Sequence, residues 1–208
     1  MFKRPFLLPR VRRVALEHVQ GRPILVSPDI LNPVVFRSGE WFARSLAKLL
    51  PAAPGRLLDM GTGSGVCAVF AAQRGYEVTA VDVNPEAVRF ARINALMNRV
   101  EVDLRQGDLF EPVRGERFEF VLFNPPFFRG EARSPFDMAW RGTDVLERFA
   151  AGLCGALTPG GRGFVLLSSD GDAAGMLEAL ARENIKVSVA ERRHFGSEVM
   201  TIYEARPE

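Results

Sequence analysis

The tetrapeptide Asn124-Pro125-Pro126-Phe127 carries the most informative chemistry in the sequence, and it directly follows the strand-like stretch FEFVLF. Proline has no backbone N–H and a fixed φ, so the carbonyl groups before the two prolines are free to accept hydrogen bonds. The side-chain oxygen of Asn124 and the carbonyl of Pro125 can therefore hold an NH₂ group by its two hydrogens, which orients the lone pair of the nitrogen toward a reaction partner. Phe127 offers a flat face to a planar amide or base. The alternative, a simple proline turn, needs neither the asparagine nor the aromatic ring.

A glycine-rich turn with an acid in front of it follows another strand-like stretch, and its sequence is DMGTGSG, residues 59–65. Glycine lets a ligand approach the backbone closely. The spacing is GxGxG and differs from the GxGxxG fingerprint of dinucleotide sites. Asp59 suits a cationic amino-acid group better than a diphosphate, because two negative groups would repel each other. We therefore expect Asp59, Gly61, Thr62 and Gly63 to contact a ligand with a positive charge.

Two more acids stand where strands are expected to end. Asp82, followed by Val83, closes the β-branched stretch EVTAVDV. Its carboxylate can accept hydrogen bonds from both hydroxyls of a ribose. The alternative, a helix cap, is already provided by Asn84. Asp108 can accept from an adenine amine while Leu109 covers the ring, although a plain turn aspartate is the simpler interpretation of Asp108 by itself.

Strands and helices must alternate to bring these residues together. The patterns predict strands at 57–60, 77–83, 100–104, 118–123 and 163–168, and helices at 39–50, 66–74, 85–98, 144–157 and 172–182, with a turn at 158–161. Such alternation predicts a parallel α/β sheet covered on both faces. Two further strands, at 185–190 and 199–205, have no helix between them and are expected to form an antiparallel edge hairpin. Ligands bind beyond the carboxyl ends of the strands in such sheets, where the polar residues are expected.

Composition and charge narrow the class of protein. The chain has 208 residues, 47% of them apolar and 25% charged, as in ordinary globular proteins. Its two cysteines, Cys67 and Cys154, are expected to be buried free thiols rather than a disulfide, and no Cys/His cluster suggests a metal. No apolar run reaches the roughly 18 residues that span a bilayer. Since no secretory leader is visible either, we expect a cytoplasmic protein without membrane contact.

Basic residues gather at the amino terminus. Residues 1–13 carry five lysine and arginine residues and no acid, whereas the whole chain has a net charge of +2. We therefore divide the chain into a basic arm, 1–13, and a single domain, 14–208. The arm could contact nucleic acid or an acidic protein, or it could be only a solvated terminus.

The motifs DMGTGSG, Asp82, Gly107-Asp108-Leu109 and NPPF, in this order and spacing, resemble the class I S-adenosylmethionine-dependent methyltransferases. Within this class, NPP followed by an aromatic residue is similar to the small-methyltransferase-domain group. That group includes HemK-type glutamine methyltransferases of release factors and N-methyltransferases of RNA or DNA bases. The resemblance covers roughly residues 30–205. The stretches 139–142 and 145–149 also resemble the HemK-type branch, although its glutamine-modifying members usually have tyrosine at the position of Phe127.

The resemblance implies a Rossmann-like seven-stranded, mostly parallel sheet and S-adenosylmethionine as cofactor. In members of this class, the residues that match Gly61 and Gly63 pass beneath the methionine part of the cofactor, and the match to Asp82 holds the ribose. Asp108 and Leu109 would bind the adenine. Asn124 and Pro125 would bind the acceptor nitrogen. No metal or covalent nucleophile is needed, because orientation alone can supply roughly 7–11 kcal/mol.

The acceptor stays open between alternatives. We favour a protein glutamine amide, and the exocyclic amine of an RNA or DNA base is the next candidate. A small metabolite and a non-catalytic cofactor-binding subunit are further alternatives. The chain from 130 to 143 is expected to cover the substrate, with Arg129, Arg133 and Arg141 as anionic contacts or as solvated loop charges. His18 and His194 are expected at the surface, and the sequence leaves the oligomeric state open.

Overall fold

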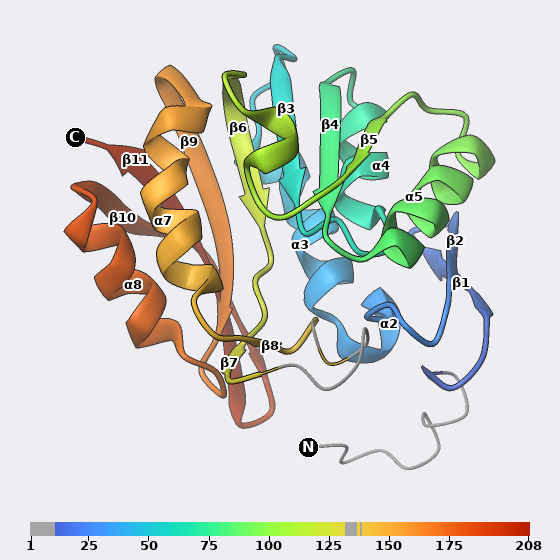
Figure 1. Cartoon of the computed structure of the whole chain (residues 1–208). Helices are drawn as coiled ribbons and strands as arrows, with labels where there is room; N and C mark the ends of the chain where they lie inside the picture. Colours follow the sequence, from blue (N-terminus) through green and yellow to red (C-terminus); the bar gives the residue numbers. More distant parts are fainter. Residues whose placement is uncertain (1–10, 132–136, 138) are drawn as a thin grey trace.

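A seven-stranded sheet forms the centre of the computed structural model, which describes residues 11–131, 137 and 139–208 (Figure 1). The strand order is β10-β11-β9-β6-β3-β4-β5. The strands are β3 (Arg56–Met60), β4 (Glu77–Asp82), β5 (Asp103–Gln106), β6 (Phe118–Phe123), β9 (Leu157–Ser168), β10 (Ile185–Phe195) and β11 (Glu198–Pro207). Neighbouring strands from β5 to β9 are parallel, whereas β11 is antiparallel to both β9 and β10. The predicted Rossmann-like α/β fold with an antiparallel edge hairpin is confirmed.

Helices cover both faces of this sheet (Figure 1). One face carries α3 (Ser38–Leu49), α4 (Val66–Ala72) and α5 (Pro85–Met97), and the other carries α7 (Val145–Ala156) and α8 (Ala173–Arg182). Successive residues of a strand point to opposite faces. Leu57 therefore enters the first core cluster with Phe42, and Leu58 enters the second with Phe149. The two apolar layers fix the sheet between the helices and hold the strand ends in place.

A small hairpin precedes the sheet, in a region where the sequence predicted no strand. Its strands are β1 (Ala15–Val19) and β2 (Arg22–Val26), joined through Gln20 and Gly21, which both have positive φ. The alternation in β1 is inverted: Leu16 is half exposed, whereas Glu17 is buried and accepts a hydrogen bond from Asn32 Nδ2 at 2.9 Å. Asn32 also caps the short helix α2 (Pro33–Phe36). Because the polar Glu17 is buried against Asn32 and the apolar Leu16 is exposed, the hydropathy pattern of this segment does not indicate a strand.

Some element boundaries differ from the prediction. The segment 158–161, predicted as a turn, belongs to β9, which accommodates it through an irregularity in its pairing with β6. The strand predicted at 100–104 begins at Asp103, because Arg99 adopts a positive φ of 55° after α5. His194 lies in the extended β10 rather than in a turn, and it is exposed like His18.

The cysteines, possible metal ligands and membrane-spanning helices were also considered in the sequence. Cys67 and Cys154 are both free thiols; Cys67 is buried as expected, whereas Cys154 is only half-buried. Within the described ranges, no group of three or more His, Cys, Asp or Glu side chains is arranged to hold a metal ion. None of the described helices is long and apolar enough to cross a membrane.

Candidate active site

A cavity of about 370 Å³ opens at the carboxyl ends of the central strands. It lies where the strand order reverses. β4 and β5 follow β3 on one side of it in the sheet, whereas β6, the next strand in the chain, lies on the other side of β3. Such a reversal of strand order leaves a crevice between neighbouring loops. The lining includes most residues that the sequence predicted: Asp59, Gly61, Thr62, Gly63, Asp82, Val83, Asp108, Leu109, Asn124 and Pro126. The structure thus brings together residues from four separate strand ends.

The glycine-rich turn forms the floor of this cavity. Gly61, Gly63 and Gly65 all have φ between 56° and 76°, which glycine adopts without strain. A Cβ atom at Gly65 would lie 2.9 Å from the Cβ of Ala91, so the turn also needs glycine because α5 packs closely against it. The backbone N–H of Gly63 donates to Asp82 Oδ2 at 2.8 Å, which ties the turn to the end of β4.

Asp59 is a buried carboxylate beneath this turn. Its Oδ2 atom accepts from the Thr62 hydroxyl at 2.6 Å and from the Ala68 backbone N–H at 3.1 Å. Burial raises the pKa of Asp59 from 3.8 to about 7, the two hydrogen bonds oppose the rise, and the nearby charge of Asp82 adds to it. A positive ligand group near Asp59 would restore its ionised form.

Asp82 is held rigidly by the backbone around it. Besides the contact with Gly63, its Oδ1 atom accepts from the Asn84 backbone N–H at 2.9 Å. Burial raises the pKa of Asp82, and these backbone hydrogen bonds oppose that effect. Asn84 caps α5 by accepting from the Glu86 N–H at 3.0 Å, so the sequence-based assignment of this cap is confirmed and Asp82 is free for another role.

Asn124 presents the clearest unsatisfied group in the cavity. Its Nδ2 atom donates to Ser38 Oγ at 3.4 Å, and its Oδ1 atom is buried without a hydrogen-bond donor among the described residues. A buried acceptor without a partner costs about 1–3 kcal/mol. The oxygen is therefore available to accept a hydrogen bond from a bound molecule. Ser38, the first residue of α3, was missed in the sequence because it lies 86 positions away.

The rest of the tetrapeptide is split between the cavity and the protein interior. Pro126 lines the cavity, whereas Pro125 is buried and does not appear on its wall. The ring of Phe127 packs on the hydrophobic core and lies 6.5 Å from the ring of Trp140, and its carbonyl accepts from the Asp172 N–H at 2.8 Å. Phe127 thus faces protein side chains in this structure, and its predicted contact with an acceptor stays a prediction.

A short parallel strand pair anchors the segment that borders the cavity. It consists of β7 (Phe128–Arg129) and β8 (Arg141–Gly142). Trp140 packs edge-on against the ring of Phe36 at 4.9 Å, which fastens the segment to α2. Residues 139 and 141–145 line the cavity. The described part of 130–143 therefore adjoins the cavity, and residues 141–142 of it form a strand rather than loop.

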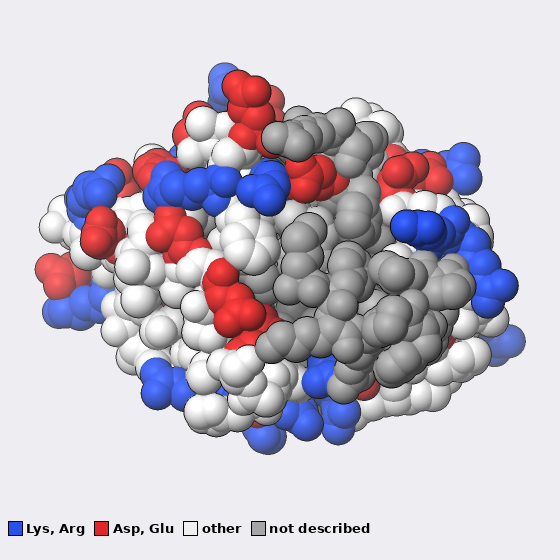
Figure 2. Space-filling model, turned by 90° about the horizontal axis from the view of Figure 1, so that it is seen from below, with Lys and Arg blue, Asp and Glu red and all other residues white. Residues whose placement is uncertain are grey.

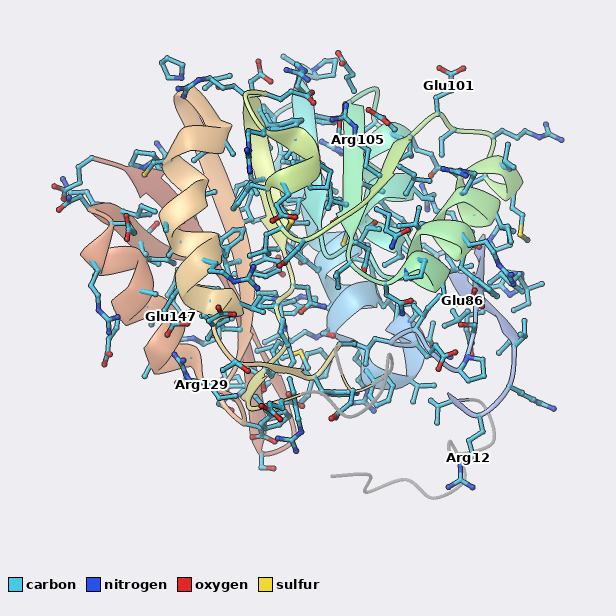
Figure 3. All side chains as sticks on the ribbon, in the orientation of Figure 1. Arg12, Glu86, Glu101, Arg105, Arg129 and Glu147 are labelled. Carbon is cyan, nitrogen blue, oxygen red and sulfur yellow. The ribbon has the colours of Figure 1, made fainter. Side chains whose placement is uncertain are left out.

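Arg129, Arg133 and Arg141, which the sequence suggested as contacts for an anion or as solvated loop charges, differ in their surroundings. Arg129 is bound to Glu147 at 2.7 Å and to Asp172, so it joins β7 to α7 and α8 and is not a free cation for a substrate (Figure 3). Arg141 lines the cavity and pairs with Asp137 at 3.5 Å. Arg133 lies outside the described residues. The prediction for Arg129 is therefore wrong, because acids on two later helices neutralise it.

The charge of the cavity wall is negative among the described residues. It holds five aspartates and two arginines, namely Asp29, Asp59, Asp82, Asp108 and Asp144 against Arg141 and Arg148. A wall of this charge attracts a cationic ligand. The outer face at this end of the molecule shows lysine and arginine side by side with acids, rather than one large basic area, in its described part (Figure 2). The sequence analysis gave Asp29, Asp144 and Arg148 no role at the site, although Arg148 lies in the stretch 145–149 that resembles the HemK-type branch.

The sequence from 39 to 195 matches the family described as Methyltransferase small domain. The chain belongs to this family. The methyltransferase is 29% identical to a putative protein N5-glutamine methyltransferase of Methanocaldococcus jannaschii, over 84% of this chain and 93% of the relative. It is 33% identical to a release factor glutamine methyltransferase of Koribacter versatilis, over 68% of this chain and 56% of the relative. The resemblance read from the motifs is confirmed.

Other relatives of the methyltransferase act on RNA. A ribosomal RNA small subunit methyltransferase C of Alcanivorax borkumensis is 37% identical over 52% of this chain, which spans 30% of that relative. The structure of a T. thermophilus 16S rRNA methyltransferase with AdoMet and guanosine is similar with a TM-score of 0.70, 18% identity, and coverage of 94% of this chain and 50% of that one. The structure of the E. cuniculi Mtq2–Trm112 complex, which is responsible for the methylation of the protein eRF1, a translation termination factor, is also similar, with a TM-score of 0.67, 21% identity, and coverage of 86% of this chain and 99% of that one. These structural likenesses support the fold.

Proposed function

We propose that this methyltransferase uses S-adenosylmethionine and methylates the side-chain amide nitrogen of a glutamine in a protein. The observation that carries the proposal is the buried, unpartnered Oδ1 atom of Asn124 in the wall of the negative cavity. An oxygen in this position selects an acceptor that donates a hydrogen bond, and a planar NH₂ group does so. The relatives named as glutamine methyltransferases support the same acceptor.

The cavity suits the cofactor in charge and in shape. S-adenosylmethionine, when bound, supplies a methyl group on a positively charged sulfur. The five aspartates of the wall favour that charge, and the turn from Gly61 to Gly65 lets an amino-acid group approach its backbone. Asp82 would hold the ribose hydroxyls. Asp108 and Leu109 would bind the adenine.

Asn124 would act by orientation rather than by proton transfer. Ser38 accepts from its Nδ2 atom at 3.4 Å and would thereby hold the amide so that Oδ1 can meet the acceptor. That oxygen would accept one hydrogen of the acceptor amide. The Pro125 carbonyl, which the sequence suggested for the other hydrogen, would have to become accessible on binding, because Pro125 is buried and is not on the cavity wall. Held in this way, the acceptor nitrogen needs no further rotation to reach the methyl group, which is the main source of rate enhancement in such a site.

We favour a protein over a nucleic acid because the described face beside the cavity mixes both signs of charge (Figure 2). The RNA-modifying relatives keep a base amine as the second candidate. The two free thiols are consistent with a reducing compartment, and we propose that the enzyme acts in the cytoplasm as one catalytic domain, 14–208, with the basic arm 1–13 in front of it.

The proposal can be tested with a tritiated methyl donor. The purified enzyme is incubated with cell lysate, and labelled product is treated separately with protease and with ribonuclease. We expect protease to release the label and mass spectrometry of the labelled protein to locate one added methyl group on a glutamine. Label that resists protease but is lost with ribonuclease would overturn the glutamine acceptor and favour the base amine. Asn124→Ala serves as the matched inactive control.

A further inference from the structure

Arg148 reaches the cavity from α7, and neither a motif nor the proposed chemistry has given it a role. Its Nη1 atom donates to Asp108 Oδ2 at 2.5 Å, and its Nε atom lies 3.0 Å from Asp144 Oδ1. All three side chains line the cavity. The hydrogen bond to Asp108 is the main reason why the pKa of Arg148 is raised above its ordinary value. One guanidinium thus links the end of β5 to the start of α7 at the cavity wall.

The contact occupies only one of the two oxygens of Asp108. Arg148 donates to Oδ2, which leaves Oδ1 of the same carboxylate with the capacity to accept a further hydrogen bond. A hydrogen bond from a planar guanidinium to one oxygen restricts the rotation of the carboxylate and thereby favours one direction for the other oxygen. Oδ1 is therefore an oriented acceptor, although the Asp108 side chain itself is 40% exposed.

We infer that Arg148 is a positioning residue for the base of the cofactor: it holds Asp108 so that Oδ1 accepts a hydrogen bond from the 6-amino group of adenine. This inference rests on the proposed function, in which Asp108 binds the adenine. Asp144, held by the same guanidinium, belongs to the segment 141–145 that borders the cavity. The preference for adenine and the placement of this segment therefore depend on one side chain.

Calorimetry with two ligands distinguishes this role from a merely structural one. The ligands are S-adenosylhomocysteine and its analogue in which the 6-amino group is replaced by hydrogen. The wild-type enzyme is expected to prefer the first by roughly tenfold or more, the usual range for a hydrogen bond to a charged group. Arg148→Met should reduce this preference to less than about threefold, mainly by weakening S-adenosylhomocysteine, and Asp108→Asn should do the same.

Arg129→Met is the matched control. Arg129 is another ion-paired arginine that contacts α7, through Glu147, but it does not line the cavity. Its variant should keep the wild-type preference between the two ligands even if it melts at a lower temperature. Should Arg148→Met unfold, Arg148→Gln, which keeps part of the side chain, is measured in its place and is expected to lose the preference too.

Three outcomes would overturn the inference. Equal weakening of both ligands by Arg148→Met would mean a structural role only, and an unchanged preference would mean that Asp108 needs no partner. Tighter binding of S-adenosylhomocysteine would mean that Arg148 competes with the adenine. The proposed function fails in a different way, because the wild-type enzyme would then bind neither ligand. If Asp108→Asn alone removed the preference, the proposed function would stand and only the inference about Arg148 would fall.

Discussion

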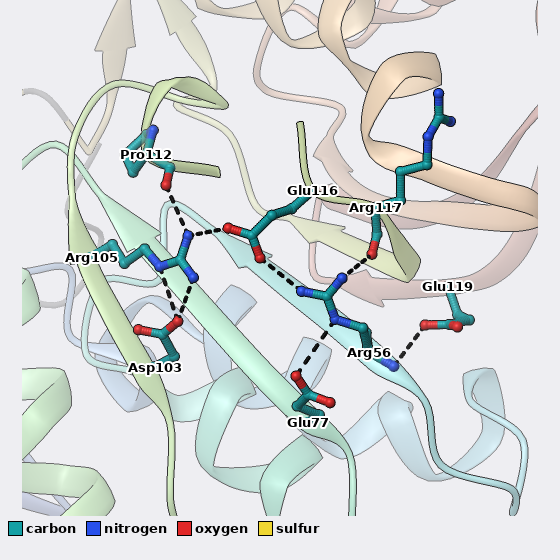
Figure 4. Close-up of polar contacts among 8 residues, drawn as sticks. All are labelled: Arg56, Glu77, Asp103, Arg105, Pro112, Glu116, Arg117 and Glu119. Atoms are coloured by element: carbon teal, nitrogen blue, oxygen red, sulfur yellow. Dashed lines mark hydrogen bonds and ion pairs between the residues drawn. The ribbon is translucent and has the colours of Figure 1, made fainter. Parts of the chain in front are cut away.

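At the amino end of the central sheet charged side chains pair with one another, whereas at the carboxyl end one buried polar atom, Asn124 Oδ1, has no partner among the described residues and two buried aspartates have raised pKa values. Arg105 at the amino end bonds Glu116, Asp103 at 2.6 Å and the Pro112 carbonyl at 2.9 Å (Figure 4). Glu116 in turn binds Arg56 at 2.7 Å. These contacts lower the pKa of Glu116, chiefly through Arg105.

The carboxyl end differs in its buried polar groups, although ion pairs such as that of Arg148 with Asp108 occur there too. Asp59 has a raised pKa of about 7, and the Oδ1 atom of Asn124 lacks a donor among the described residues. This difference between the two ends of the sheet indicates how one sheet can be stable and still bind ligands. Mutual pairing at one end ties neighbouring strands together, and unsatisfied groups at the other end gain their partners only when a ligand enters.

The largest difference between the ends should come from ligand binding. Asp82→Ala is expected to weaken binding of S-adenosylhomocysteine by roughly ten- to hundredfold, since a charged hydrogen-bond acceptor is lost. Asp103→Ala, the same change at the amino end, should leave the affinity within about twofold, because such exposed pairs contribute little. Calorimetry on both variants measures this. Similar losses in the two variants would remove the distinction between the ends.

Ser38→Ala sharpens the role of the unpaired oxygen. Without the Ser38 hydroxyl, the Asn124 amide can rotate, and we expect kcat to fall by roughly tenfold, in line with the cost of misplacing a reacting group. Affinity for S-adenosylhomocysteine should stay unchanged, and Ser38→Thr, which keeps the hydroxyl, should retain most of the activity. A fall in cofactor affinity that matches the fall in kcat would argue that Ser38 only supports the fold.

The raised pKa of Asp59 predicts a pH dependence that extends to about neutral pH, whereas the lowered pKa of Glu116 at the amino end predicts one in acid only. Because the folded-state pKa is raised from 3.8 to about 7, the stabilisation from this protonated carboxyl is complete below 3.8 and is lost as pH rises through about 7. A bound cation reverses the preference, so affinity for S-adenosylhomocysteine should increase between about pH 6 and about pH 8. Thermal melts measure the pH dependence of stability, and calorimetry measures that of affinity, in the wild type and in Asp59→Asn. Identical pH profiles in both proteins would contradict the assignment.

The smallest effect is expected at the amino end itself. Glu116→Gln removes one acid that bridges Arg56 and Arg105, and partly exposed pairs contribute up to about 1 kcal/mol each. We expect a slightly lower melting temperature, most visible at low salt, and unchanged methyl transfer. Chemical denaturation at two salt concentrations measures the change. A large loss of activity in Glu116→Gln would mean that the two ends are coupled.

The fold was largely predictable because its signals are local. The stretch Phe118–Phe123, the glycine turn after Met60 and the Asn84 cap each lie within a few residues of the structure they specify. The hairpin β1–β2 was not predictable, since Glu17 is buried through a partner 15 residues away while Leu16 faces outward.

The site was predictable only in part, because only some of its contacts are local in the sequence. Residues at strand ends can be found from the strands, and they do line one cavity. The partners that orient them come from far along the chain: Ser38 contacts Asn124 across 86 positions, and Arg148 contacts Asp108 across 40. Such tertiary contacts leave no periodic pattern, and the neutralisation of Arg129 by two later helices is an example in which the pattern misled.

The central claim about the site is that Asn124 holds the acceptor. A crystal structure of the enzyme with S-adenosylhomocysteine and a glutamine-containing peptide from a release factor tests it directly. We expect the glutamine Nε2 atom within about 3.2 Å of Asn124 Oδ1, in the same cavity as the cofactor product. A structure in which Asn124 Oδ1 bonds another protein group, with the glutamine amide elsewhere, would contradict the account.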